Sequence, residues 1–194
     1  MRGSLVCGTA AACVLAGALG SAALADTITG TSGTDHLVGT AGADSIDGRR
    51  GNDRLFGRAG RDGLRGGPGA DTLYGGRHAD DMTGAAGADF IHGGRGHDEL
   101  VDWVATEFDA GGGTGPADPD RLYGGRGNDF LGFTDGRDRV GAGPGRDQLR
   151  TETDAFDDVI NCGAGRDRLI YFYALDDKDT TVGCERVLLR TFTP

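Results

Sequence analysis

The stretch GGPGADTLY, from Gly66 to Tyr74, combines turn-forming glycine and proline with one aspartate and a short apolar run. The nine residues before it read GRAGRDGLR, and the nine before those read GRRGNDRLF. The same order of glycine, aspartate and aliphatic residue therefore returns every nine residues. A fixed short period of this kind indicates a tandem repeat of stacked units.

The aspartates keep the nine-residue register through a first block that begins at Gly30. They are Asp35, Asp44, Asp53, Asp62, Asp71, Asp80, Asp89 and Asp98. Two residues after them stand Leu37, Ile46, Leu55, Leu64, Leu73, Met82, Ile91 and Leu100. The residue two positions before each aspartate is a glycine: Gly33, Gly42, Gly51, Gly60, Gly69, Gly87 and Gly96, with Gly127 in the next block. The one exception in the first block is His78. Composition bias alone does not produce this phase.

Two later blocks repeat the rule. The second contains Asp120, Asp129, Asp138 and Asp147, and the third, offset by two residues, contains Asp158 and Asp167. Between the first two blocks lies the segment 102–119, where Asp98 and Asp120 are 22 residues apart. We interpret this segment as a loop excursion or degenerate repeats, with Trp103 and Phe108 packing against the interior.

The repeat unit predicts a turn followed by a minimal strand. Glycine allows positive φ and close packing in the turn, and the three residues centred on the aliphatic one can form a short strand. Two units, or eighteen residues, would form one coil with two turns and two strands. Stacked coils would bury the aliphatic column between two parallel sheets.

Composition agrees with a repeat fold and points to cations as ligands. The chain of 194 residues contains 38 glycines and only 37% hydrophobic residues, which disfavours a conventional core. Its formal charge of −10 argues against nucleic acid and anionic membranes. A metal-free repeat with solvated Asp and Gly turns is the alternative, but turn chemistry alone would accept Asn or Ser at many of these positions.

Several units resemble a known repeat. GGPGADTLY, GGRGHDELV and GGRGNDFLG are similar to the RTX, or haemolysin-type, calcium-binding nonapeptide G-G-x-G-x-D-x-U-x. The resemblance covers roughly residues 30 to 101 and 120 to 170. It implies an all-β fold, a right-handed parallel β-roll solenoid, with the first repeat block at 26–101 and the later blocks at 120–170.

The resemblance also implies Ca²⁺ as the cofactor, bound by the aspartates of all three blocks together with backbone carbonyls. Calcium takes six to eight oxygen ligands at about 2.3–2.6 Å. Turns of like parity stack in the family, so ions are expected between the Asp35 and Asp53 turns and between the Asp44 and Asp62 turns, with about six sites in the first block. Binding and folding would then be one process. The turns of Asp80, Asp138 and Asp147 are weaker candidates because His78, Phe133 and Ala142 replace glycines.

Residues 1–25 have the pattern of a secretory signal peptide: Arg2, a short apolar stretch and Ala23-Leu24-Ala25. We expect cleavage after Ala25, removal of Cys7 and Cys13, and no membrane span afterwards. Cys162 and Cys184 would remain in an oxidising compartment, where pairing is the default. Their bond would close a loop of about 20 residues and would stabilise the folded state by about 3 kcal/mol. VGCERVLLRTF is similar to the end piece of small exported RTX proteins, so 171–194 is predicted to be a C-terminal cap.

A catalytic role is not expected. His36, His78, His92 and His97 show no H-E-x-x-H zinc motif, and no nucleophile-base pattern is present. The chain is therefore predicted to be a secreted or cell-surface structural, adhesive or binding module for a protein or glycan. The alternative is a non-catalytic remnant or accessory of an RTX exoenzyme or toxin.

The outward positions of the repeat differ between the two faces. Residues eighteen apart should stack, which places Val38, Phe56, Tyr74 and His92 on one face with Phe90 beside them. The other face carries Asp47, Arg65, Thr83 and Val101. The aromatic row either stiffens its sheet or forms a partner surface through Phe56, Tyr74, Phe90 and His92.

Overall fold

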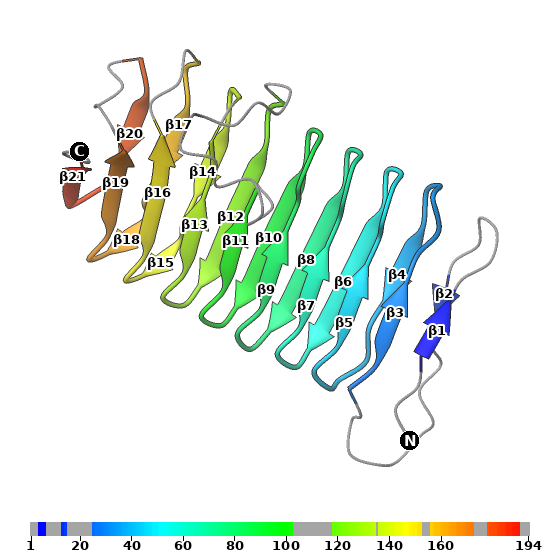
Figure 1. Cartoon of the computed structure of the whole chain (residues 1–194). Coiled ribbons are helices and arrows are strands. Elements are labelled where there is room, and N and C mark those ends of the chain that lie inside the picture. Colours follow the sequence, from blue (N-terminus) through cyan, green and yellow to red (C-terminus); the bar gives the residue numbers. More distant parts are fainter. Residues whose placement is uncertain are drawn as a thin grey trace.

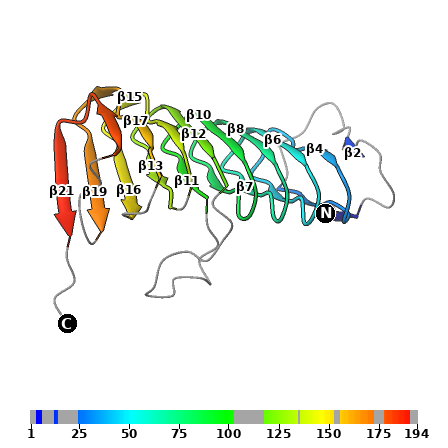
Figure 2. The same ribbon diagram turned by 90° about the horizontal axis from the view of Figure 1, so that it is seen from above.

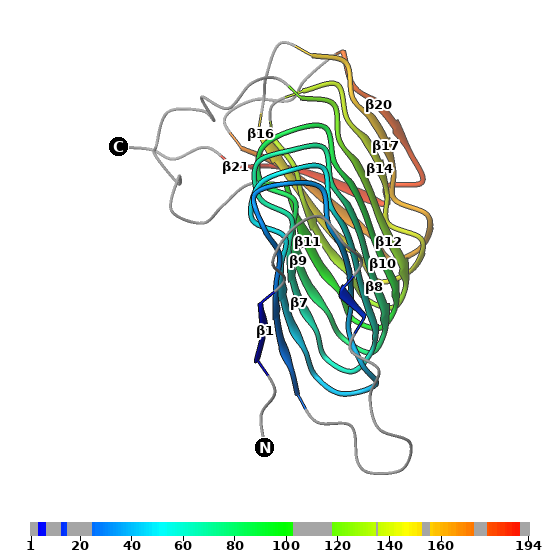
Figure 3. The same cartoon turned by 90° about the vertical axis from the view of Figure 1, so that its right-hand side faces the viewer.

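The chain forms a parallel β-solenoid of about eight turns, as predicted (Figure 1). The computed structural model describes residues 4–6, 13–14, 25–102, 118–134, 136–152, 156–172 and 178–190. Within these ranges the chain has no helix, and so none that could cross a membrane. Successive coils follow one another along one axis from β1 to β21 (Figure 2), and they overlap in the view along that axis (Figure 3).

Two long sheets face each other across the solenoid. The first sheet has the order β1 (Ser4–Val6), β3 (Thr27–Thr29), β5 (Ser45–Asp47), β7 (Gly63–Arg65), β9 (Asp81–Thr83), β11 (Glu99–Val101), β13 (Phe130–Gly132), β16 (Gln148–Glu152), β19 (Arg168–Phe172) and β21 (Arg186–Arg190). The second sheet has the order β2 (Cys13–Val14), β4 (His36–Val38), β6 (Arg54–Ala59), β8 (Thr72–Arg77), β10 (Phe90–Arg95), β12 (Arg121–Arg126), β14 (Arg139–Gly141), β17 (Val159–Asn161) and β20 (Thr180–Val182). A small third sheet pairs β15 (Pro144–Gly145) with β18 (Ala164–Gly165).

The eighteen-residue coil explains the topology. Each strand pairs in parallel with the strand two units later, so Ile46 lies opposite Leu64 in the first sheet and Leu55 opposite Leu73 in the second. Because side chains alternate along a strand, the central aliphatic residue of each three-residue strand points inward. The column from Ile28 to Leu169 is buried throughout and forms the core.

The later coils contain insertions that leave the stacking intact. β10 pairs directly with β12 and β11 with β13, although Phe90 and Arg121 are 31 residues apart rather than 18. The 102–119 segment therefore adds thirteen residues beyond one coil, and no described strand intervenes. Trp103 and Phe108 lie outside the described residues.

The C-terminal coils have a wider core than the first block. Buried side chains stand two residues after the column positions, where the first block has glycine as far as Gly93: Phe133, Ala142, Thr151, Cys162 and Tyr171. The predicted Cys162–Cys184 disulfide is confirmed, with the two Cα atoms 5.0 Å apart.

The predicted C-terminal cap, 171–194, contains the last described strands of the solenoid. β20 and β21 extend the second and first sheets by one further coil. Val182, Val187 and Leu189 of this coil are exposed. At the opposite end, β1 and β2 lie within the predicted signal peptide and pair with β3 and β4.

Candidate metal centres

All fourteen aspartates predicted as ligands are buried, and they form two ladders along the two edges where the chain passes between the sheets. The first ladder, after the strands of the first sheet, contains Asp35, Asp53, Asp71, Asp89, Asp120, Asp138 and Asp158. The second ladder, after the strands of the second sheet, contains Asp44, Asp62, Asp80, Asp98, Asp129, Asp147 and Asp167. Turns of like parity therefore stack, as the repeat predicted.

In every ladder carboxylate except that of Asp35, Oδ1 accepts a backbone N–H from the turn of the previous coil. The backbone N–H of Asp35 donates to Oδ1 of Asp53 at 2.8 Å, and that of Asp53 donates to Oδ1 of Asp71 at 2.7 Å. The pattern continues across the insertion, where Asp89 donates to Asp120 at 2.6 Å. The aspartate thus positions its neighbour as well as itself.

The second carboxylate oxygen is buried without a hydrogen-bond partner in most turns. This holds for Oδ2 of Asp53, Asp62, Asp71, Asp80, Asp89, Asp98, Asp129, Asp138, Asp147 and Asp167. A buried anionic oxygen without a donor is costly unless a cation neutralises it. The repetition of this atom from coil to coil indicates a built set of cation sites.

The first glycine of each unit forms a cradle beside this oxygen. A Cβ added to Gly48 would lie 2.6 Å from Asp53 Oδ2 and 2.8 Å from the carbonyl oxygen of Gly66 in the next coil. A Cβ on Gly124 would lie 2.6 Å both from Asp129 Oδ2 and from the carbonyl oxygen of Ala142. A carboxylate and a carbonyl of successive coils therefore converge at a place that only glycine leaves open.

Burial shifts the proton equilibria of these carboxyls. Desolvation raises the pKa of Asp53 and Asp71 to about 6, of Asp80 to about 7 and of Asp89 to about 8, although the backbone N–H bond of the previous aspartate opposes the shift. Neighbouring ladder carboxylates raise these pKa values further. Desolvated carboxylates close to one another are the environment in which a divalent cation replaces protons.

The donor set fits a hard cation. Calcium is bound by carboxylate and carbonyl oxygens together, which are the atoms that meet at the cradles. In the described part of the chain no three His, Cys, Asp or Glu side chains gather around one point. Sites here would therefore be shared between turns, with backbone carbonyls supplying many of the ligands.

The turns are not equivalent. In the first coil Thr31 donates to Asp35 Oδ2 through its backbone N–H at 2.6 Å and its hydroxyl at 2.9 Å, and the Thr40 hydroxyl donates to Asp44 Oδ2 at 3.0 Å. Threonine occupies the second glycine position of the repeat in both units. These two carboxylates already have protein donors that the interior turns lack.

The replaced glycines identified in the sequence have different consequences. His78 keeps its turn at φ 79°, and its Nδ1 accepts the backbone N–H of Gly60 at 3.3 Å, so the Asp80 turn resembles its neighbours. Phe133 and Ala142, in contrast, place side chains at the cradle positions of Asp138 and Asp147. Burial raises the pKa of Asp138 to about 9, with the charges of Asp102 and Asp158 adding to the shift.

Two features of the candidate metal sites were not found from the sequence. Asp179 extends the first ladder by accepting the backbone N–H of Asp158 at 3.0 Å, and the hydroxyl of Tyr171 donates to its Oδ2 at 2.7 Å. The 21-residue separation and the absence of an aliphatic residue two positions later hid it. Cys162 was recognised only as a disulfide partner, although it also stands at the cradle position of Asp167.

The glycines predicted as turn residues divide into two groups. Gly51, Gly60, Gly69, Gly87 and Gly127 have φ between 120° and 153°. Gly33, Gly42 and Gly96 are not among the positive-φ glycines. Gly96 is nevertheless required by close approach, because an added Cβ would lie against the carbonyl oxygen of His78.

The predicted aromatic row on the second sheet is present and longer than expected. The rings of Phe56 and Tyr74 stack at 5.2 Å and 6°, and Tyr74 contacts Phe90 at 5.5 Å and His92 at 5.9 Å. Tyr123 continues the row beyond the insertion, opposite His92.

The fold and the two aspartate ladders together define a calcium-binding β-solenoid. The model of the RTX calcium-binding nonapeptide repeat matches residues 29–64, 65–100 and 114–140. The chain therefore belongs to this repeat family, whose nonapeptides bind calcium ions. No curated protein matches the chain.

Proposed function

We propose that this chain is an exported structural or adhesive module whose β-solenoid folds when extracellular calcium fills the two aspartate ladders. The family assignment supports calcium binding, and the signal-like segment 1–25 supports export. The fourteen ladder aspartates are proposed as the ligands, with the interior turns from Asp53 to Asp129 as the strongest sites.

The buried, unpartnered Oδ2 atoms carry this proposal. Each is held within the solenoid by an Oδ1 bond to the neighbouring coil, so it cannot turn to water without breaking the ladder. One aliphatic side chain per nine residues provides little apolar burial relative to the conformational entropy lost by the unit. Neutralisation of the ladders by calcium supplies the remaining stabilisation.

Circular dichroism of the chain without residues 1–25 tests this function. We expect a coil-like spectrum in chelator and a change to β-structure at roughly 10⁻⁴–10⁻³ M calcium, the range of extracellular modules. Magnesium should be much less effective because its small octahedral shell suits a carbonyl-rich site poorly. A full β spectrum that persists in chelator at neutral pH would refute calcium-coupled folding.

Export is tested separately in the source cells. Mass spectrometry of the protein recovered outside the cell should give Asp26 as the N-terminal residue and a Cys162–Cys184 bond. A chain that keeps residues 1–25, or that is found only inside the cell, would exclude the exported role without affecting calcium binding.

A further inference from the structure

The second sheet carries a groove that continues onto the turns of the second ladder. It has a volume of about 1050 Å³ and crosses the strands from β6 to β17. Its floor is a strip of glycines, each packed against the carbonyl oxygen of the previous one: Gly76, Gly94, Gly125, Gly143 and Gly163. Because the floor has no side chains, an extended ligand could lie against it along the solenoid axis.

One wall of the groove is a row of arginines. Arg95 lies opposite Arg77 on one side and Arg126 on the other, in parallel strands about 4.8 Å apart. All three are exposed, and Arg58 and Arg139 also line the groove. Like charges directly opposite in a sheet are destabilising, so this row lowers the stability of the free protein.

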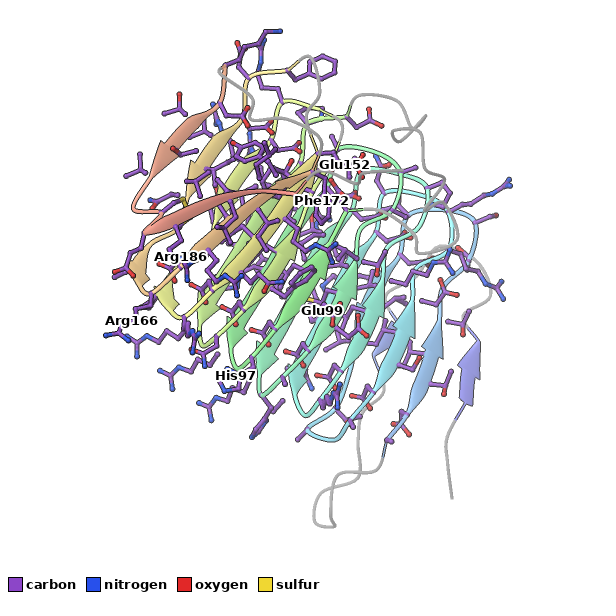
Figure 4. All side chains as sticks on the ribbon, turned by 60° about the vertical axis from the view of Figure 1, so that its left-hand side comes forward. His97, Glu99, Glu152, Arg166, Phe172 and Arg186 are labelled. Carbon is purple, nitrogen blue, oxygen red and sulfur yellow. A yellow bond between two sulfur atoms is a disulfide. The ribbon has the colours of Figure 1, made fainter. Side chains whose placement is uncertain are left out.

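Within the described ranges, no ion pair joins the arginine row to an acidic side chain. In the described ranges the one ion pair joins Arg137 to Asp157 at 3.7 Å, away from the groove. The turn edge beside the groove adds further basic side chains, including Arg61, Arg146 and Arg166. His97 and Arg166 lie along this edge, the lower one in Figure 4.

The net charge of the chain does not indicate that the face around the groove is basic. The formal charge of −10 includes the ladder aspartates, which are buried and which calcium would neutralise. The exposed charge near the groove is therefore positive, although the composition is acidic. A partner of negative charge is complementary to this face.

The wall of the groove opposite the arginines limits which negatively charged molecules could bind. His92 and Tyr123 line it with apolar ring surface and polar tips. Neighbouring rings of the row are in contact, with centroids 5.2 to 5.9 Å apart. Single-stranded nucleic acid is held by bases that stack on aromatic rings, and rings in contact leave no space for a base between them.

We propose that the groove binds a linear acidic polysaccharide that carries a carboxylate on each sugar. The arginines would pair with successive carboxylates, since guanidinium groups bind carboxylates in a bidentate way. The aromatic wall would cover the apolar edge of the sugar chain. This inference rests on the calcium-folded solenoid proposed above, because only the folded coil brings Arg77, Arg95 and Arg126 into one row.

The test is calorimetry with an oligogalacturonate too short to gel with calcium, added to the calcium-folded protein. We expect binding that weakens as salt is raised and that is absent for the fully methyl-esterified oligomer, which has the same sugars without the charge. Equal binding of both forms, or tighter binding of an oligothymidylate or polyglutamate of similar length, would overturn the proposal.

Matched variants locate the site. The pair Arg95→Gln and Arg126→Gln should weaken binding by about tenfold, whereas the pair Arg50→Gln and Arg65→Gln, exposed outside the groove, removes the same charge and should leave binding unchanged. Arg95→Lys with Arg126→Lys should be intermediate. Equal affinity of the groove pair and the control pair would overturn the assignment.

Circular dichroism of every variant separates the two proposals. Calcium-induced folding without binding contradicts only the polysaccharide site, whereas absence of calcium-induced folding in the parent chain contradicts the proposed function itself. The methyl-ester comparison uses the unmodified chain, so the proposal stays testable if a variant does not fold.

Discussion

The first block of coils and the C-terminal coils share one architecture but differ in what stabilises them. Between Ile46 and Ile91 each unit buries one aliphatic side chain, and glycine stands two residues later against an open carboxylate oxygen. Between Leu131 and Tyr171 the corresponding positions hold Phe, Ala, Thr, Cys and Tyr, which add to the core.

We propose that this one position decides between two ways of stabilising the coil. A glycine there would leave room for a cation between a carboxylate and a carbonyl, whereas a side chain there would replace the ion by apolar burial. The C-terminal coils add a disulfide and five-residue strands in β16, β19 and β21. The ion-dependent block therefore continues into coils that depend less on calcium.

Chelation should give the largest effect and separate the two regions. In chelator, we expect amides of residues 44–102 to lose protection from hydrogen exchange almost completely, because the ladder carboxylates repel one another without ions. Amides of residues 156–172 and 178–190 should keep measurable protection. Uniform loss along the whole chain, or uniform retention, would contradict the division.

Removal of the disulfide should act on the other region. Cys162→Ser with Cys184→Ser is expected to destabilise the C-terminal coils by about 3 kcal/mol, since the bond constrains the unfolded chain. Denaturant unfolding in saturating calcium measures the loss, and reduction of the parent chain serves as the control. The calcium midpoint of the first block should not change; a shift of severalfold would show that the regions are coupled.

A side chain added at one cradle glycine should collide with the atoms proposed to bind the ion. In Gly66→Ala the new Cβ would lie 2.9 Å from the Gly84 carbonyl oxygen and still closer to Asp71 Oδ2, which we expect to cost about 1–3 kcal/mol. Gly63→Ala is the matched control, because the nearest atom to its Cβ is 4.0 Å away. Denaturant unfolding in calcium compares them, and equal stability of the two variants would exclude the cradle.

Two aspartates of the same ladder should respond differently to amide substitution. Asp71→Asn removes a charged ligand and is expected to raise the calcium midpoint severalfold. Asp138→Asn should change it by less than about twofold, because a pKa of about 9 keeps this carboxyl neutral at pH 7. Calcium titrations followed by circular dichroism test the pair, and an equal shift for both would show that Asp138 is as strong a ligand as Asp71.

The smallest effect expected is a partial replacement of calcium by protons. The pKa values of Asp53, Asp80 and Asp89 rise on folding from 3.8 to about 6, 7 and 8, so the metal-free fold is favoured at low pH and loses this stability as pH rises through about 6 to 8. In chelator, acidification should increase the β signal. With calcium the dependence reverses, because deprotonated ligands bind the ion. A β signal in chelator that rises with pH would contradict this.

The sequence by itself determined the repeat, the ladder residues and the pairing of coils. A period of nine with a fixed phase leaves one way to bury Leu55, Leu64 and Leu73 in a common column, and the register follows from that column. It also placed Phe56 beside Tyr74, since outward residues eighteen apart must stack. The disulfide followed from the two cysteines that remain after the predicted cleavage.

Only the tertiary structure decided which turns leave a carboxylate oxygen without a protein donor. The repeat does not reveal that Thr31 donates to Asp35, or that Gly48 rather than Gly51 faces the ligand oxygen, because these contacts depend on the distance between successive coils. The sequence also gave no sign of the basic groove, because the net charge adds buried carboxylates and exposed guanidinium groups together. Stacking separates the two: it places the aspartates inside and aligns Arg77, Arg95 and Arg126 outside.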